Sequence, residues 1–349
     1  MDLEWQLKQL RESVHRTQKK ILDAYISKQI LLTHVFEDLS NLAEQALEKA
    51  AAIALEETKP KFTTPKGSLT IVAMGKLGGR EMTFYSDLDL VFLYENPDDI
   101  ECYTYFVRRL ISALTLVTLE GYAYHIDTEL RPSGNAGMLL STLEGFEFYH
   151  LHNAQHWERQ ALLKARPILI LSQMKPSPEF YYRTQDVIDR LRYSEFKVNK
   201  SELSRELYEI RLRIQNEISK ETKSLYNIKS GYGGLIDIEF LVQYFQLLES
   251  YHYPLLRTTS TLQGLQALAA LDLFPYDDIQ QLIHTYLYYR ELETYFRITL
   301  EKSTDQIRFP SEITTKVEET YYQGKNILVS YLPSREIVRS LYLRALGIS

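Results

Sequence analysis

The sequence predicts an α+β fold in which a small sheet lies between two helical segments. Three observations predict it. Apolar residues recur with helical period over the first part of the chain, short β-rich apolar runs follow, and the helical period then returns up to the end. These patterns divide the chain into an N-terminal helical segment, 1–66, a core, 67–175, and a C-terminal helical domain, 176–349.

Composition argues against several classes of protein. The 349 residues include 46 acidic and 40 basic side chains, a net charge of −6, whereas a dedicated nucleic-acid binder usually has a basic face or a high pI. The single cysteine, Cys102, allows neither a disulfide within the chain nor a cysteine-based zinc site. Residues 1–12 lack the apolar core of a secretory signal, and no stretch approaches the ~18 apolar residues of a membrane span. We therefore expect a cytoplasmic protein with no membrane and no nucleic-acid partner.

Residues 1 to about 58 are expected to be helical. Charged residues fill the gaps between apolar residues that share one helix face. The clearest apolar stripe is Leu32, Val35, Phe36, Leu39, Leu42 and Ala43. Pro60 and Pro65 then interrupt the pattern, which places the first domain boundary near residue 66.

The central part is expected to contain three short strands. Residues 69–74 form an apolar, β-rich run, and residues 88–94 and 122–130 are the second and third expected strands. Helices are expected over residues 101–120 and 144–164. The core therefore alternates strands and helices, unlike the segments on either side.

The chain from about residue 175 is expected to be helical to its end. The helical period recurs over 177–223, 235–250, 262–271, 276–300 and 312–347. The expected breakers are Pro254, Pro275, Pro310 and Pro333. The core pattern has no second copy, so we expect no internal repeat.

Asp87 and Asp89 are the first candidates for a metal site. Side chains two residues apart in a strand point to the same face, so Leu88 and Leu90 should point the other way, into the core. Two adjacent carboxylates repel each other unless a cation lies between them. Hard oxygen ligands of this kind suit Mg²⁺, which binds through a few carboxylates and substrate phosphates. The pair therefore predicts a magnesium site.

A glycine-rich turn lies about eight residues before this pair. Gly78 and Gly79 follow a strand and are expected to precede a helix. The absence of side chains lets the backbone approach a phosphate, and N–H groups at the start of a helix attract an anion. Lys76 and Arg80 flank the turn and add positive charge. The pattern predicts a phosphate-binding turn beside the metal site.

A third carboxylate is needed if two metal ions are to be held. Asp127 lies in the third predicted strand, and a neighbouring strand could bring it opposite Asp87 and Asp89. Two metal ions about 3.5–4 Å apart stabilise the attacking and leaving oxygens of an in-line displacement. Arg131, just past this strand, is a candidate for contact with a triphosphate oxygen.

These features also have ordinary structural explanations. A Gly-Gly pair alone is usually a turn, and Asp-x-Asp alone is usually a solvated strand end or a cap; their order and spacing together favour function. Lys164 and Arg166 are either cations at a helix C-terminus or phosphate contacts. Trp157 is expected to pack in the core, with base stacking as the alternative. The basic residues of 197–229, Arg211 among them, are expected on a solvated helix surface.

The motifs in this order resemble a known family. The strand, the Gly-Gly turn and the Asp-x-Asp pair are similar to the DNA polymerase β-like nucleotidyltransferase superfamily, and more closely to glutamine synthetase adenylyltransferase. The segments that carry the resemblance are Gly75–Glu81, Ser86–Phe92, Leu130–Leu139, His156–Pro167 and Lys229–Phe240. The similarity runs from about residue 35 to past residue 300.

The resemblance implies a polymerase β-like core, a small mixed sheet with helices, flanked by an N-terminal helical segment and a C-terminal helical bundle. It implies transfer of AMP from ATP to a tyrosine hydroxyl of glutamine synthetase, with Mg²⁺ held by Asp87, Asp89 and Asp127. The implied nucleotide-binding residues are Lys76, Gly78, Gly79, Arg80, Ser86 and Arg131. The family's enzymes carry two such units in tandem, and the unit seen here is most similar to the adenylylating half.

Two positions depart from the family pattern. Glu129 stands where the family has an arginine, between Asp127 and Arg131, and Asn227 stands where the family has an aspartate. Three other functions therefore stay open. They are phosphorolytic removal of AMP from adenylylated glutamine synthetase, AMP transfer to another acceptor, and a catalytically silent module that binds the synthetase.

Overall fold

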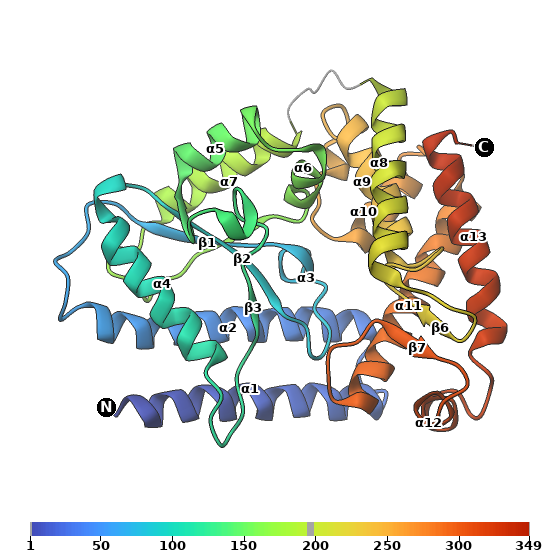
Figure 1. The fold of residues 1–349 in the computed structure, drawn as a ribbon, viewed down its shortest axis with the longest axis horizontal. Helices are drawn as coiled ribbons and strands as arrows, with labels where there is room; N and C mark the ends of the chain where they lie inside the picture. Colours follow the sequence, from blue (N-terminus) through green and yellow to red (C-terminus); the bar gives the residue numbers. More distant parts are fainter. Residues whose placement is uncertain (1, 194–198, 349) are drawn as a thin grey trace. The chain divides into compact units, whose positions relative to one another are not determined.

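The computed structural model describes residues 2–193 and 199–348 (Figure 1). It has the predicted α+β fold, a small mixed sheet with helical flanks. The chain forms two compact units, Met1–Arg192 and Tyr193–Ser349. The N-terminal helices share the first unit with the sheet. No helix among the described residues is both long enough and apolar enough to cross a membrane.

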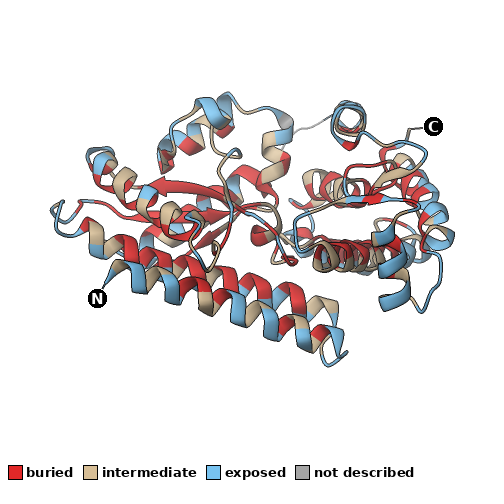
Figure 2. Ribbon diagram, turned by 60° about the horizontal axis from the view of Figure 1, so that its bottom comes forward, coloured by how far each residue is buried: buried red, intermediate tan, exposed pale blue. Residues whose placement is uncertain are grey.

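Two long helices begin the first unit. α1 (Leu3–Ile26) packs on α2 (Leu32–Thr58), and α2 packs on α4 (Ile100–Thr115). The predicted apolar face of α2 is confirmed, and its buried residues form a continuous stripe (Figure 2). Members of the stripe that are at most 5% exposed are Val35, Phe36, Leu39, Leu42 and Ala43. α2 ends just before Pro60, as the proline predicts.

The sheet has five strands in the order β3-β2-β1-β5, with β4 also paired to β2. The strands are β1 (Leu69–Ala73), β2 (Leu88–Tyr94), β3 (Ile126–Asp127), β4 (Leu140–Thr142) and β5 (Arg166–Ile168). β1 is antiparallel to β2 and β5, whereas β3 and β4 are parallel to β2. The predicted strand 122–130 is reduced to β3, because the chain turns where the Arg131 N–H bonds the Thr128 carbonyl at 3.3 Å.

The other helices of the first unit are α3 (Gly75–Gly78), α5 (Leu143–His152), α6 (His156–Leu162) and α7 (Pro178–Tyr193). A single helix over 144–164 is wrong: the Glu158 carboxylate accepts the Gln155 N–H at 2.9 Å and starts α6 as a separate helix. The predicted helix 101–120 ends early, at Thr115.

The last helix of the first unit, α7, completes its core. The apolar side chains of α7 share one cluster with residues of β1 and β2. The compact unit therefore extends to Arg192. The domain boundaries that the sequence predicts near residues 66 and 175 stay predictions.

The second unit is largely helical. Its helices are α8 (Lys200–Ile214), α9 (Leu235–Glu249), α10 (Thr261–Ala270), α11 (Tyr276–Leu300), α12 (Glu312–Tyr321) and α13 (Leu328–Leu346). Within the expected all-helical segment, β6 (Leu225–Asn227) pairs antiparallel with β7 (Gln306–Arg308). Pro333 does not break the helix: it lies inside α13, where buried neighbours such as Tyr331 and Val338 anchor both sides. Residues 194–198, within the predicted helix 177–223, lie outside the described residues.

His150 on α5 is a buried histidine of the first unit. Its side chain is 3% exposed, and neither ring nitrogen has a hydrogen-bond partner among the described residues. The Phe146 ring contacts it edge-on at 4.4 Å. Burial lowers the pKa of His150 from 6.5 to about 4, and the nearby Arg159 charge acts in the same direction. The folded protein therefore holds this imidazole neutral.

The unfolding free energy of the first unit should fall as pH falls from 6.5 towards 4. In this window the unfolded chain binds a proton at His150 that the folded chain does not bind. Because protonation then favours the unfolded chain, the unfolding free energy is lower by about 3 kcal/mol at pH 4 than at pH 6.5. His150→Phe should flatten the dependence in urea unfolding measured across this window. His34→Gln, at an exposed site on α2, is the control. An unchanged slope in His150→Phe would contradict the assignment.

Candidate active site

The candidate site lies where β1 ends and β2 begins. β2 and β3 pair in parallel with Leu88 opposite Ile126 and Asp89 opposite Asp127. The neighbouring strand therefore brings Asp127 beside Asp89, as expected from the sequence. Leu88 and Leu90 are fully buried, so they point into the core and away from the carboxylates, also as expected.

The three aspartates differ in their surroundings. Asp87 is exposed just before β2, whereas Asp89 and Asp127 are half-buried. Oδ1 of Asp127 accepts the N–H of Glu129 at 2.7 Å, which orients the carboxylate.

Carboxylate oxygens on neighbouring strands are donors that suit Mg²⁺. In phosphoryl-transfer sites this ion is usually held by one or two carboxylates with substrate phosphates completing its shell. Across residues 2–193 and 199–348, no three or more His, Cys, Asp or Glu side chains gather closely enough to hold a metal ion by themselves. The adjacent Asp89 and Asp127 fit the two-carboxylate arrangement, and the assignment of all three aspartates as ligands stays a prediction.

Gly75 is a site residue that the sequence analysis did not single out. It has a positive φ of 53°, which favours glycine. A Cβ at this position would lie 2.1 Å from Oδ2 of Asp89. The Asp89 carboxylate therefore occupies the space that any other residue at 75 would need. The signal available in the sequence was a glycine directly after a buried strand.

Gly78 and Gly79 close a helix instead of opening one, so the expected helix start is wrong. Their N–H groups bond the carbonyls of Met74 (2.9 Å) and Gly75 (3.0 Å). Both amides are therefore used within the turn. Gly78 is required by packing, since a Cβ there would lie 1.9 Å from the Lys164 carbonyl oxygen. Phosphate contact by this pair stays a prediction.

The glycine turn is held to α2 by a pair of arginines that share Glu44. Nη2 of Arg166 bonds Glu44 Oε1 at 2.6 Å and the Leu77 carbonyl at 3.1 Å, and its Nε reaches the Gly78 carbonyl at 3.3 Å. Arg166 thus caps the C-terminal carbonyls of α3, where a cation is favoured. Nη1 of Arg80 bonds the same Glu44 oxygen at 3.1 Å.

The other predicted phosphate contacts have different surroundings. Arg80 also bonds Asn41 at 2.6 Å, so its guanidinium is directed to α2. Lys76 lies on α3 and is half-buried. Ser86 is buried, and its hydroxyl lies 3.1 Å from the Thr83 hydroxyl, which closes the turn before Asp87. All three lie between β1 and β2, and the Arg80 side chain is the one that turns away to α2.

Arg131 and Glu129 organise the loop that follows β3. Nη1 of Arg131 bonds the Thr128 carbonyl at 2.7 Å, and its Nε bonds the Gly137 carbonyl at 3.4 Å. Oε1 of the exposed Glu129 accepts from Asn135 at 2.6 Å. The residue that departs from the family pattern therefore contributes a loop hydrogen bond.

The structure places Trp157 on the surface and Lys164 just past the end of α6, the latter as predicted. Trp157 is 43% exposed, so its expected place in the core is wrong; its Nε1 bonds Gln155 on the surface. Lys164 approaches Glu81 at 3.8 Å with both side chains largely buried.

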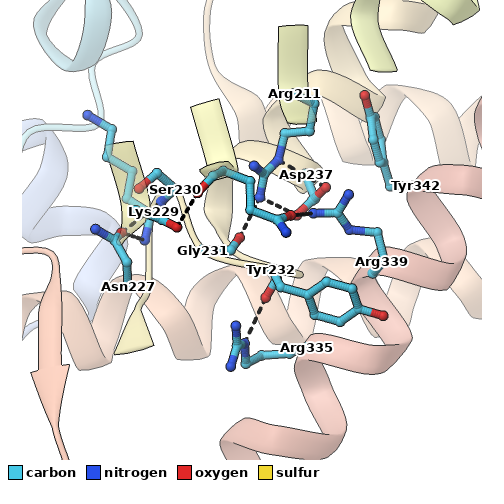
Figure 3. A network of polar contacts seen from close by, with 12 residues as sticks. Arg211, Asn227, Lys229, Ser230, Gly231, Tyr232, Asp237, Arg335, Arg339 and Tyr342 are labelled. Carbon is cyan, nitrogen blue, oxygen red and sulfur yellow. Dashed lines mark hydrogen bonds and ion pairs between the residues drawn. The ribbon is translucent and has the colours of Figure 1, made fainter. Parts of the chain in front are cut away.

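The second glycine-rich motif lies in the other unit (Figure 3). Asp237 is fully buried and pairs with Arg211 at 2.9 Å and Arg339 at 3.3 Å. Arg211 is itself fully buried, so its expected place on a solvated helix surface is wrong. Its carboxylate partner lies 26 residues away in the sequence. Residues 197 and 198 of that basic segment lie outside the described residues.

Comparison with known proteins gives matches along most of the chain. Residues 1–180 match the family described as glutamate-ammonia ligase adenylyltransferase. Residues 205–322 match the family described as GlnD PII-uridylyltransferase.

Several curated relatives share one description, bifunctional glutamine synthetase adenylyltransferase/adenylyl-removing enzyme. The protein of Mannheimia haemolytica is 29% identical over 337 residues, 90% of this chain and 34% of the relative. That of Nitrosomonas eutropha is 30% identical over 83% of this chain and 30% of the relative. That of Haemophilus ducreyi is 31% identical over 85% of this chain and 32% of the relative. The chain thus spans about a third of the length of these relatives.

Gly75→Ala should weaken binding of Mg²⁺-ATP at least tenfold, because the new Cβ displaces the Asp89 carboxylate; tenfold corresponds to about 1.4 kcal/mol. Isothermal titration calorimetry measures the affinity for Mg²⁺-ATP. Gly121→Ala is the control: φ is also positive (82°), but its Cβ would meet only His15, at 3.6 Å. Both variants share the backbone strain. Unchanged binding in Gly75→Ala would contradict a role for the Gly75–Asp89 contact.

Arg166→Gln should lower the unfolding free energy of the first unit by about 1.5–3 kcal/mol, the range for hydrogen bonds that involve a charged group. Urea unfolding gives the value. Arg183→Gln is the control, because Arg183 also forms ion pairs, with Glu95 and Glu144, but is 45% exposed against 22% for Arg166. Exposed pairs contribute about 0–1 kcal/mol. Equal losses in the two variants would show that Arg166 does not hold the turn.

Proposed function

We propose that this chain, which belongs to the glutamate-ammonia ligase adenylyltransferase family, transfers AMP from ATP to a tyrosine hydroxyl of glutamine synthetase and releases pyrophosphate. The observation that carries the proposal is the register pairing of Asp89 with Asp127 beside Gly75. The names of the relatives support the transferred group and the acceptor.

The chemistry proposed for this site is an in-line displacement. The tyrosine oxygen forms a bond to the α-phosphorus of ATP, and the bond from that phosphorus to the bridging oxygen of pyrophosphate breaks. When bound, Mg²⁺ would neutralise charge that develops on the phosphate oxygens. Asp87, Asp89 and Asp127 are the residues proposed to hold it. Asp127, fixed by the Glu129 N–H, is placed to receive or orient the hydroxyl proton.

The other residues of the site position the turn and the phosphates of ATP. The turn that carries Lys76 and Ser86 leads the chain from β1 to Asp87, and Arg166 holds this turn to Glu44. We propose that Lys76, Gly78, Gly79, Ser86 and Arg131 lie along the phosphates of ATP. Arg80, whose guanidinium bonds Glu44 and Asn41, would contribute by supporting the turn. A cytoplasmic setting fits the single, buried free thiol of Cys102.

Phosphorolytic removal of AMP is the second candidate function. The relatives are named for both adenylyl transfer and adenylyl removal, and both reactions would use the same carboxylates. In removal, an oxygen of inorganic phosphate forms a bond to the phosphorus of the AMP-tyrosine and the bond from that phosphorus to the tyrosine oxygen breaks, so that ADP leaves and the tyrosine oxygen takes up a proton. Dependence on phosphate separates the two directions.

The test is incubation of the chain with α-labelled ATP, Mg²⁺ and glutamine synthetase, followed by detection of label on the synthetase. Asp87→Asn and Asp89→Asn should each lower transfer at least about a hundredfold. Asp38→Asn, which removes the same charge at an exposed position on α2, should leave transfer unchanged.

Two outcomes would overturn the proposal. If the synthetase acquires no label from this chain, while a related adenylyltransferase labels the synthetase under the same conditions, the proposed acceptor is wrong. If label appears but survives Asp89→Asn, the carboxylate assignment is wrong. Loss of label from adenylylated synthetase only when phosphate is added would instead support removal. Adducts on other proteins, found by mass spectrometry, would indicate another acceptor.

A further inference from the structure

A cavity of about 400 Å³ opens on the second unit. The residues of α13 that line it share one face of the helix, since they are spaced three and four apart: Glu336, Arg339, Ser340, Leu343 and Arg344. Tyr232, from the glycine-rich loop, and Ile348 complete the lining. A hollow of this size with a few convergent polar groups is typical of small-molecule sites.

Arg339 lines this cavity and carries one buried hydrogen-bond donor without an acceptor in the described part of the chain. The residue is 4% exposed. Its Nη2 bonds Gln215 at 2.5 Å and Asp237 at 3.3 Å. Nε is buried with no partner among the described residues. A buried N–H without an acceptor is costly, so this guanidinium favours an added acceptor.

The negative charge that faces Arg339 is already shared. Both oxygens of Asp237 accept from Arg211, at 3.1 and 2.9 Å, and only one of them also reaches Arg339 (Figure 3). One carboxylate therefore serves two buried guanidinium groups. Burial lowers the pKa of Arg339, and Asp237 opposes that shift. An anion in the cavity would supply the second negative charge.

The mouth of the cavity adds one cation, one hydroxyl and one carboxylate. Arg344 is exposed and pairs with Asp278. Ser340 is exposed beside it. The Glu336 carboxylate accepts from the Tyr232 hydroxyl at 2.9 Å. Among the lining residues, two side chains are therefore positive and one is negative, with the aliphatic Leu343 and Ile348 between them.

We propose that this cavity binds a small anion through a carboxylate or phosphate group, with Arg339 and Arg344 as its cationic contacts. The guanidinium fork suits both groups, because each offers two oxygens in the plane of the donors. Glu336 opposes an anion and so limits affinity. The site uses residues of the second unit alone and goes beyond the function proposed above.

The test is calorimetric titration of the whole chain with inorganic phosphate and, separately, with acetate, at constant ionic strength set by chloride. Saturable binding of at least one anion is expected, and the anion that saturates identifies the preferred group. Arg344→Gln should weaken binding about fivefold, whereas Glu336→Gln should strengthen it. Ser340→Phe, which fills the hollow without changing charge, should abolish it.

Arg308→Gln is the matched control, because it removes one positive charge from an exposed position on β7, away from the lining residues. It should leave affinity unchanged. The substituted side chains at 336, 340 and 344 are exposed, so circular dichroism should show an unchanged fold. Absence of saturable binding for both anions would overturn the proposal. Equal weakening in Arg308→Gln and Arg344→Gln would also overturn it, since binding would then follow net charge.

Discussion

The contact between Gly75 and Asp89 is the constraint on which the rest of the candidate site depends. The N–H of Met74 bonds the Asp89 carbonyl at 2.9 Å, so β1 runs beside β2 up to the point where the chain must turn. The turn passes directly over the Asp89 carboxylate, and only a glycine with positive φ leaves room for it. α3 and the loop that leads to Asp87 begin from this close approach, and the pairing with β3 lies beside it.

The two units use buried charge in different ways. In the first unit, Glu44 and Arg166 form a half-buried pair, and Arg166 secures one short turn by donating to carbonyls that a helix end leaves unpaired. In the second unit, Arg211 and Asp237 are fully buried. Removing two such charges from water costs several kcal/mol per ion, which only close geometry and further hydrogen bonds offset. The Gly231 carbonyl supplies one of these bonds to Arg211. The surplus positive charge carried by Arg339 is what distinguishes this cluster from a simple ion pair.

Elements with a strong local period could be predicted from the sequence, and elements that depend on distant partners could not. The stripe of α2 and the strands β1 and β2 follow from the spacing of apolar residues. The break between α5 and α6 depends on one side chain, Glu158, that caps a new helix. The β6–β7 ribbon pairs segments about eighty residues apart, and strands of three residues have too few positions to show a period.

By itself the sequence determined the fold class and the family, and it predicted which carboxylates form the site, because Asp-x-Asp after a glycine turn is a local pattern of residue types. It also placed Leu88 and Leu90 in the core, since alternation along a strand needs no partner. Only the tertiary structure decided that Gly75 lies against Asp89, that Arg166 holds the turn and that Arg211 is buried. The partners in these contacts come from separate elements, 122 residues apart for Arg166 and Glu44. The periodicity of one segment carries no information about which distant side chain will meet it.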